Sequence, residues 1–228
     1  NNTINQFYKD DNGLFCGLDE STVDKEDLSD VSSRYLGQKL FGGAKVVWVD
    51  TESPEILVGT SRVNPTEVEI VKRIISKLSE DEGYLKFKDY WSDADEKEIG
   101  VITFYGAQKQ LLQKAIPVSM NRRISVVDRF QGMERNVIIC SLVRSNKIAE
   151  SESAMIETYR NNVGDFSLGF AQSPNRLNVA LSRAKRLLII VGNSEHFSQK
   201  DIYKNVYKSI QEGPYGLIVD SKEFMANE

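Results

Sequence analysis

The stretch that most constrains the fold is 187–191, LLIIV, five consecutive residues without a polar side chain for either face of a strand. A strand of this kind cannot border water, so the sheet that contains it must be covered on both sides. Apolar runs at 46–49, 99–103 and 137–143 repeat the pattern along the chain. With helical segments between them, these runs predict an α/β fold built on a mostly parallel sheet flanked by helices on both faces.

Helix-start signals separate the apolar runs. Asn64, Pro65 and Glu67 follow the order of an N-cap, a first-turn proline and an acid that closes a capping box. Apolar residues then recur at helical spacing as far as Leu78. A second serine–proline pair begins a helix predicted over 174–184, whose apolar residues form a single stripe.

The chain divides into one large domain with additions. Residues 1–44 are polar and irregular, and we expect a lead-in segment that belongs to the same domain. The domain itself is expected over 45–212. It carries an insertion at 147–170, because this polar stretch is longer than most connections. We expect 213–228 to form a C-terminal tail.

Composition excludes several classes of protein. The 228 residues are 40% hydrophobic and 27% charged, which is typical of a globular protein. No apolar run approaches the ~18 residues of a membrane span. Cys16 and Cys140 are far apart, which favours reduced thiols and a cytoplasmic location over a disulfide or metal pair. The single histidine, His196, leaves little room for a zinc site or a catalytic triad, so no metal site is expected.

Charge is unevenly distributed along the chain. The net charge is −4, yet residues 101–146 hold seven Lys or Arg against two acids. Residues 170–193 hold four basic residues and no acid. These basic segments either face an anion or are solvated strand ends and helix faces, and charge alone leaves both readings open.

The stretch VVDRFQGMERNVIICSLVRSN places a polar hinge between two buried runs. In one reading Gly132 supplies a turn, Asp128 caps an amide and Glu134 pairs with Arg135. In the other, the hinge lines a ligand site. Ligands of open α/β sheets lie beyond the carboxyl ends of the strands, where FYGAQ and FQGME are both expected.

Two arginines of the predicted helix 174–184 share one face. Arg176 and Arg183 are seven residues apart, so they lie nearly in line at the margin of the apolar stripe. Aligned guanidiniums suit a phosphate, whose oxygens the planar fork binds in pairs. The alternative is two surface arginines that pair with local acids.

Three stretches in order resemble motifs IV, V and VI of the superfamily 1 helicases. They are GVITFYGAQ, the hinge stretch above, and GFAQSPNRLNVALSRAKRLLIIVGN. The nearest branch is similar to the superfamily 1B enzymes typified by the RNA helicase of nonsense-mediated decay. GTSRVNPTEVEIVKRI resembles the S-x-x-N-x-x-E segment that begins the second helicase domain's first helix. The resemblance covers about residues 45–193, and it implies a RecA-like second motor domain.

The resemblance also implies roles for single residues. Arg183 matches the arginine finger, which reaches the γ-phosphate of ATP bound by the other motor domain, and Glu134 matches a glutamate near the ribose. Gln131 and Gly132 match the turn that joins the nucleotide site to the strand groove. Arg176 matches a second arginine of motif VI at the nucleotide side.

Contacts with nucleic acid, or coupling between the two sites, are implied for a further group. Its members are Thr103, Tyr105 and Gln108 of the motif IV match and Asp128 of the motif V match. One departure bears on these contacts. Val126 stands where the family commonly has Thr or Ser, which removes a hydroxyl that could touch a phosphate.

The implied partners are ATP and Mg²⁺ in the full-length protein, single-stranded DNA or RNA, and an N-terminal RecA-like domain of the same chain. The sequence holds no G-x-x-x-x-G-K-[ST] and no D-E-A-type strand end. We therefore expect this fragment alone neither to bind ATP tightly nor to hydrolyse it. An alternative is a non-catalytic module that docks nucleic acid or protein, although such a module needs no finger. A flavodoxin-like domain would need a glycine-rich loop after its first strand, which is missing.

Overall fold

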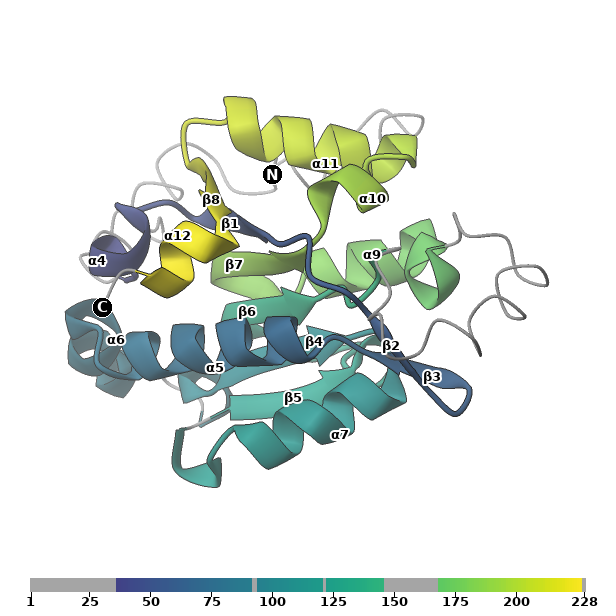
Figure 1. Ribbon diagram of the computed structural model, residues 1–228. Coiled ribbons are helices and arrows are strands. Elements are labelled where there is room, and N and C mark those ends of the chain that lie inside the picture. The colour runs from purple at the N-terminus through teal and green to yellow at the C-terminus, as the bar shows by residue number, and fades with distance from the viewer. Residues whose placement is uncertain (1–35, 92–93, 121, 146–167, 227–228) are drawn as a thin grey trace.

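A six-stranded sheet forms the centre of the molecule, in the order β5-β4-β6-β7-β1-β8 with every neighbouring pair parallel (Figure 1). The computed structural model describes residues 36–91, 94–120, 122–145 and 168–226. The strands are β1 (Val46–Asp50), β4 (Ile99–Thr103), β5 (Arg122–Val126), β6 (Arg135–Ser141), β7 (Ala184–Gly192) and β8 (Gly216–Asp220). A separate antiparallel pair joins β2 (Ile56–Val58) to β3 (Ser61–Val63).

Helices cover both faces of the sheet, as the apolar runs predict. One face packs against α4 (Gln38–Phe41), α5 (Pro65–Ser79), α6 (Glu82–Phe87), α7 (Gly106–Ala115) and α12 (Ser221–Ala226). The other packs against α9 (Pro174–Leu181), α10 (Ser194–Phe197) and α11 (Asp201–Glu212). Short 3-10 turns complete the described chain: η2 (Lys88–Tyr90), η3 (Asp95–Lys97), η4 (Val118–Met120), η5 (Val127–Arg129) and η7 (Gly169–Gln172). The predicted doubly covered α/β fold is confirmed.

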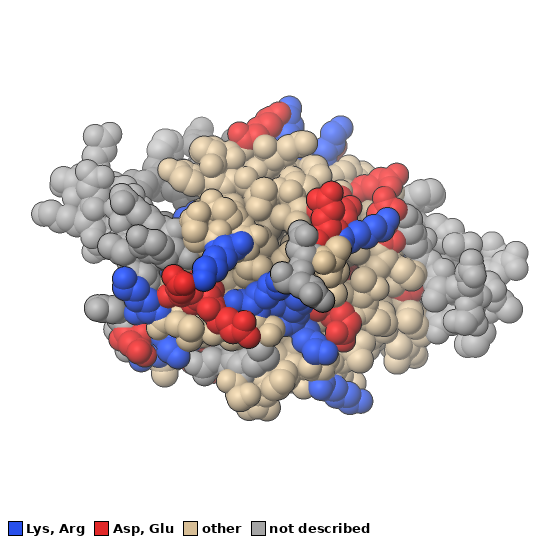
Figure 2. Space-filling model, turned by 60° about the vertical axis from the view of Figure 1, so that its left-hand side comes forward, with Lys and Arg blue, Asp and Glu red and all other residues tan. Residues whose placement is uncertain are grey.

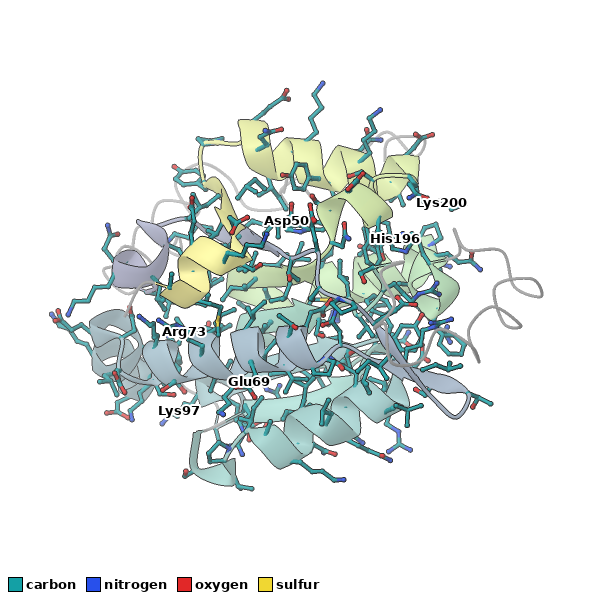
Figure 3. All side chains as sticks on the ribbon, in the orientation of Figure 1. Asp50, Glu69, Arg73, Lys97, His196 and Lys200 are labelled. Carbon is teal, nitrogen blue, oxygen red and sulfur yellow. The ribbon has the colours of Figure 1, made fainter. Side chains whose placement is uncertain are left out.

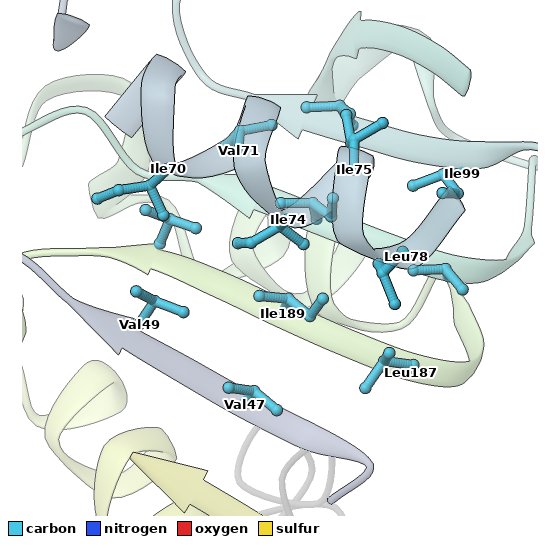
Figure 4. Close-up of a cluster of buried hydrophobic side chains, with 14 of the residues drawn as sticks. Val47, Val49, Ile70, Val71, Ile74, Ile75, Leu78, Ile99, Leu187 and Ile189 are labelled. Carbon is cyan, nitrogen blue, oxygen red and sulfur yellow. The ribbon is translucent and has the colours of Figure 1, made fainter. Parts of the chain in front are cut away.

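β7 shows why the fold needs two helical layers. Leu187 and Ile189 point into the cluster under α5, where Ile74 is also fully buried (Figure 4). Leu188 and Ile190 belong to the opposite cluster, with α9 and α11. Because successive side chains of a strand alternate between faces, the apolar run supplies both cores at once.

The start of α5 is capped as predicted at one of its two contacts. Asn64 Oδ1 accepts the backbone N–H of Glu67 at 3.1 Å. The predicted return contact is wrong, because the Asn64 N–H donates to Gln108 Oε1 at 2.9 Å instead. The Glu67 carboxylate turns inward and accepts the Ser141 hydroxyl at 2.6 Å. Tertiary partners in α7 and β6 therefore replace the return contact of the capping box.

The helix predicted over 174–184 is shorter than the sequence suggests. α9 ends at Leu181, and the Ser182 N–H closes its last turn onto Asn178 O at 2.9 Å. Arg183 lies outside the helix, because its carbonyl already accepts the Arg135 N–H of the neighbouring strand at 3.0 Å. Sheet pairing ends the helix early, although nothing in the local sequence stops it.

The segment expected as a tail at 213–228 instead completes the sheet. β8 pairs in parallel register with β1, from Val46 opposite Gly216 to Asp50 opposite Asp220. The following helix α12 buries Phe224 against Phe41, with ring centroids 6.2 Å apart. The half-buried residues of this edge strand are too weakly patterned to be recognised as a strand locally. Most of 1–44 and of 147–170 lies outside the described residues.

Among the described residues, no helix is long and apolar enough to cross a membrane.

Candidate functional site

The predicted site residues are divided between the amino edge of the sheet, where the parallel strands begin, and the carboxyl edge, where they end. β5 and β6 run in the same direction, so segment 127–134 returns from the carboxyl end of one to the amino end of the other. It crosses the face covered by α9, where Val127 and Phe130 are buried. The interpretation that FQGME lies beyond the carboxyl ends is therefore wrong, because this stretch leads to the amino edge.

Glu134 and Arg183 come together at the amino edge. They immediately precede β6 and β7, which are neighbours in the sheet. The Arg135 N–H donates to Arg183 O at 3.0 Å, which ties the two approach segments to each other. The Glu134 side chain is exposed and Arg183 is half-buried. The structure thus brings the predicted finger and the predicted ribose contact to one accessible edge.

The Arg183 guanidinium is folded back onto the end of its own helix. Its Nε donates to Val179 O at 3.2 Å and its Nη2 to the Ser182 hydroxyl at 2.7 Å. Carbonyls of the last helical turn carry partial negative charge, which favours a cation there. In the described part of the chain no carboxylate forms an ion pair with Arg183, so its positive charge is held by neutral acceptors only.

Gly132 makes the turn that leads into this edge. Its φ of 80° lies in the left-handed region, and a Cβ at this position would meet no atom within 4 Å. Backbone conformation alone therefore explains the glycine. Gln131 and Gly132 are both exposed. Arg135 donates through Nη1 to the backbone carbonyl of Glu134 at 2.7 Å, so the Glu134 carboxylate is not engaged by that bond.

Arg176 lies apart from Arg183, near the other end of α9. Arg176 belongs to the first turn of α9, whereas Arg183 follows its last residue, Leu181. Arg176 forms a bidentate pair with Asp128, with Nε–Oδ1 at 2.9 Å and Nη2–Oδ2 at 3.0 Å. A hollow of about 200 Å³ adjoins this pair. Its lining consists of Val127, Asp128, Gln131, Asn175, Arg176 and Val179.

The three residues of the motif IV match are all buried. Thr103 and Gln108 have no exposed surface, and Tyr105 keeps 3%. Gln108 holds two elements together: its Nε2 donates to Asn64 O at 3.2 Å and to the Ser141 hydroxyl at 3.0 Å. None of the three side chains presents a surface to a nucleic-acid strand, and Gln108 links α7 to the start of α5 and to β6.

Glu67 is a functional candidate that the sequence indicates only as a capping residue and as the last position of the S-x-x-N-x-x-E match. It is fully buried, and burial raises the pKa of its carboxyl to about 8. Both of its oxygens accept the Val143 N–H at 3.0 Å, and Asn64 Nδ2 donates to Val143 O at 3.3 Å. Val143 has a φ of 74°, a strained conformation for a β-branched residue. These contacts hold the chain in that conformation just beyond the carboxyl end of β6.

A second buried carboxylate lies beside it. Glu55 forms ion pairs with Arg62 and with Arg144, the latter at 2.9 Å, and accepts the Ser145 N–H at 2.7 Å. Glu55 and both arginines are less than 9% exposed. Two guanidiniums on one carboxylate satisfy the buried charges in part and lock the β2–β3 pair to the exit of β6. In the sequence, the polar residues Arg144 and Ser145 directly after the apolar β6 run are the signal that could have indicated this cluster.

The carboxyl ends of β1 and β7 are closed by polar contacts of their own (Figure 3). Asp50 accepts the backbone N–H of Ser194 at 2.8 Å and its hydroxyl at 2.5 Å. His196 is 2% exposed, and burial together with the Arg144 charge lowers its pKa to about 4. The imidazole is therefore neutral at physiological pH and belongs to the core.

The surface charge is mixed. Figure 2 shows lysine and arginine side chains interspersed with acidic ones on the face it presents. Among the described residues no group of His, Cys, Asp or Glu is arranged to hold a metal ion. Cys140 is buried in the sheet. Burial raises the pKa of its thiol, so the thiol stays protonated and unreactive as a nucleophile. Cys16 lies outside the described residues.

The sequence matches a family model described as "AAA domain" over residues 4–195. It is 35% identical over 161 residues to the DNA polymerase alpha-associated DNA helicase A of Saccharomyces cerevisiae, which covers 66% of this chain and 19% of that protein. It is 32% identical over 174 residues to the regulator of nonsense transcripts 1 of Caenorhabditis elegans, covering 70% and 14% respectively.

A third relative is the probable helicase senataxin of Homo sapiens, 31% identical over 149 residues, or 61% of this chain and 5% of senataxin. The chain therefore spans between 5% and 19% of the length of these three proteins. Their names agree with the resemblance carried by the three motif-like stretches.

Proposed function

Because the chain belongs to the AAA domain family and is a RecA-like domain of the superfamily 1 helicases, related to the nonsense-mediated-decay branch, we propose that it is the second motor domain of an ATP-dependent helicase or translocase. In this proposal ATP lies between this domain and an N-terminal RecA-like domain of the same protein. A single strand of DNA or RNA crosses the carboxyl edge. The observation that carries the proposal is the juxtaposition of Arg183 and Glu134 at one accessible edge.

The amino edge is suited to the nucleotide. Mg²⁺-bound ATP, held by the partner domain, supplies the phosphoryl group. Arg183 is available to bind a phosphate. Its guanidinium donates to a carbonyl and a hydroxyl, both neutral acceptors that a charged phosphate oxygen would displace. Moved outward, it would stabilise the negative charge that develops during phosphoryl transfer. The exposed Glu134 carboxylate would accept hydrogen bonds from the ribose.

Arg176, Gln131 and Gly132 take different places in the proposal. Arg176 is engaged with Asp128 at the start of α9, whereas Arg183 follows the end of that helix, so we assign Arg176 to the nucleic-acid side and not to the phosphates. Gln131 and Gly132 form the exposed turn between the two sides. Their proposed role is to connect the nucleotide site to the groove that binds the nucleic-acid strand.

The buried residues are proposed to couple the two sites. A bound nucleic-acid strand cannot touch the side chains of Thr103, Tyr105 and Gln108, because all three are buried. Gln108 and Glu67 connect α5, α7 and the end of β6 through Ser141. A shift of β6 caused at its amino end by nucleotide would therefore reach the carboxyl edge through this network.

No phosphate-binding loop occurs in the sequence, so catalysis is proposed only for the two domains together. The purified 228-residue chain is expected to show no Mg²⁺-dependent ATP hydrolysis, with or without a single strand. Robust turnover by this chain alone would contradict the division of labour between domains.

The test of the proposal is ATP hydrolysis by the full-length protein, measured with and without single-stranded DNA or RNA. Arg183→Ala is expected to lower kcat by about 10³- to 10⁵-fold, the range for an arginine finger, with ATP binding largely kept. Arg183→Lys retains the charge but not the fork, so it should recover little of the loss.

Lys185→Ala is the matched control, because Lys185 is an exposed cation two residues further along the same edge. Its kcat should stay within about twofold of the unaltered protein if the effect belongs to the finger. An Arg183→Ala protein with unchanged turnover would instead favour a module that docks nucleic acid or protein without catalysis.

A further inference from the structure

Phe170 is an exposed aromatic ring at the carboxyl edge of the sheet. It keeps 53% of its surface exposed, although its neighbours Leu168 and Ala171 are fully buried. A single exposed apolar residue is ordinary on protein surfaces and has no meaning by itself. The surroundings of this one distinguish it.

The backbone that presents Phe170 is tightly determined. Gly169 has a φ of 54°, and a Cβ there would overlap the Tyr105 hydroxyl and lie 3.1 Å from Arg144 Nη1. Only glycine fits both the conformation and the space. Tyr105 in turn donates its hydroxyl to Leu168 O at 3.4 Å, and its ring centroid lies 5.6 Å from that of Phe170. The contacts of Tyr105 therefore hold the Phe170 ring in place from its buried side.

A cation with a fixed orientation lies over the ring. The guanidinium carbon of Arg176 lies 5.5 Å from the Phe170 centroid, within cation–π range. Asp128 holds this guanidinium through two hydrogen bonds, so its orientation is set before any ligand arrives. Preorganisation of this kind reduces the entropy lost on binding.

The hollow next to Arg176 limits what can bind. Its volume of about 200 Å³ is below the ~300–1,000 Å³ of sites that enclose a whole small ligand. Gln131 and Asn175 are among its lining residues, and their carboxamides can both donate and accept hydrogen bonds. The site can therefore take one flat polar edge while the rest of the ligand stays outside.

We propose that Phe170 and Arg176 form a stacking platform for one base of a single-stranded nucleic acid, with the edge of the base in the adjoining hollow. The inference rests on the proposed function, since it specifies how the strand side reads its ligand. Aromatic and guanidinium planes stack on any base, so the platform would grip the strand without selecting a sequence. The Arg176–Asp128 pair is neutral overall, which points to the base and not to a phosphate as the group recognised.

The test compares strands with and without bases. The full-length protein would be titrated with a short thymidine oligomer, its uridine counterpart, and an abasic sugar–phosphate oligomer of equal length. Phe170→Ala should weaken binding of both base-containing strands by about tenfold to a hundredfold and leave the abasic strand unaffected. The slope of log Kd against log salt should not change, because no phosphate contact is lost. A loss confined to the thymidine or the uridine oligomer would identify DNA or RNA as the strand that occupies the platform.

Two further variants make the result specific. Phe170→Trp should retain affinity, and its added fluorescence should be quenched by the base-containing strands and not by the abasic one. Tyr215→Ala removes an aromatic residue that is 66% exposed at the opposite, amino edge, and it should leave binding unchanged. Thermal unfolding of each variant confirms that the fold is kept.

Equal affinity of the Phe170→Ala and unaltered proteins for base-containing strands would overturn the platform, while strand-stimulated ATP hydrolysis could still uphold the proposed motor. A loss that affects the abasic strand equally would also overturn it, because the contact would then be with the backbone. Absence of binding to any of the strands by the unaltered protein would overturn both the platform and the strand-binding part of the proposed function.

Discussion

At the scale of single residues, the buried carboxyl of Glu67 makes the stability of the fold depend on pH. Burial raises its pKa to about 8, so the folded chain holds a proton that the unfolded chain releases near pH 4.5. The stability linked to this proton is fully present below pH 4.5 and is lost as the pH rises towards 8. The physical cause is the cost of burying an ionised carboxylate, which outweighs the hydrogen bonds that the Val143 N–H and the Ser141 hydroxyl donate to it.

Glu67→Gln is therefore expected to remove this part of the pH dependence. Across pH 5–8 the unaltered chain should lose stability relative to the variant by up to about 1.4 kcal/mol per pH unit. Glutamine keeps the size and one acceptor oxygen, and the Ser141 hydroxyl can rotate to suit it. Urea unfolding at several pH values measures the difference. Parallel curves for the two proteins would show that Glu67 stays ionised in the fold.

At the scale of elements, the two capped helices differ in what their caps do. The Ser173 hydroxyl accepts the Arg176 N–H at 3.5 Å, whereas Asn64 caps α5 and also donates through Nδ2 to Ser53 O and Val143 O. Asn64 is also fully buried. A cap with several buried partners ties its helix to the sheet, while a cap at the surface stabilises only the first turn.

Ser173→Ala should accordingly cost about 1 kcal/mol of unfolding free energy, the usual cost of a lost cap. Asn64→Ala should cost about 3 kcal/mol, because the half-buried Ser53 carbonyl and the buried Val143 carbonyl lose their donor as well. Asn64→Ser, which keeps a cap acceptor without the amide donors, should fall between the two. Denaturant unfolding provides the comparison, and equal costs for Asn64→Ala and Ser173→Ala would reduce Asn64 to an ordinary cap.

At the scale of the whole molecule, the sheet extends to the last described helix. β8 closes the outer edge of β1, and α12 buries Phe224 against the first core cluster. A chain that ends at Glu212 leaves the β1 edge unpaired and this part of the core open.

Truncation after Glu212 should remove several kcal/mol of a total near 5–15 kcal/mol, and it should promote aggregation. Phe224→Ala in the complete chain should cost about 3 kcal/mol. The exposed Tyr215→Ala should change stability by less than about 0.5 kcal/mol. Denaturant midpoints and light scattering decide the outcome. A truncated chain that unfolds at the same midpoint as the complete one would restore the view of 213–228 as a dispensable tail.

The same scale explains how one domain can serve two ligands. Parallel strands give the sheet one edge of strand beginnings, with Arg183 and Glu134, and one edge of strand ends, with Phe170 and Arg176 nearby. β6 runs between them and carries Ser141, to which Glu67 and Gln108 are bonded. Separation by the length of a strand keeps the two sites distinct, and the strand itself connects them.

The sequence alone determined the features that depend on local chemistry. The run at 187–191 required two helical layers because it is apolar on both faces, and Asn64 and Ser173 marked two helix starts because their side chains accept the first free N–H groups. The order of three motif-like stretches was enough to indicate the family.

Tertiary structure decided the rest, because each of those features depends on partners far away in sequence. Pairing with β6 ended α9 before Arg183, and the distant Ser141 and Val143 drew Glu67 inward from its expected cap. Strand direction placed Glu134 and Arg183 together and left Arg176 with Asp128. Periodicity carries no information on strand direction or on which buried polar groups meet, so only the packed sheet could settle either.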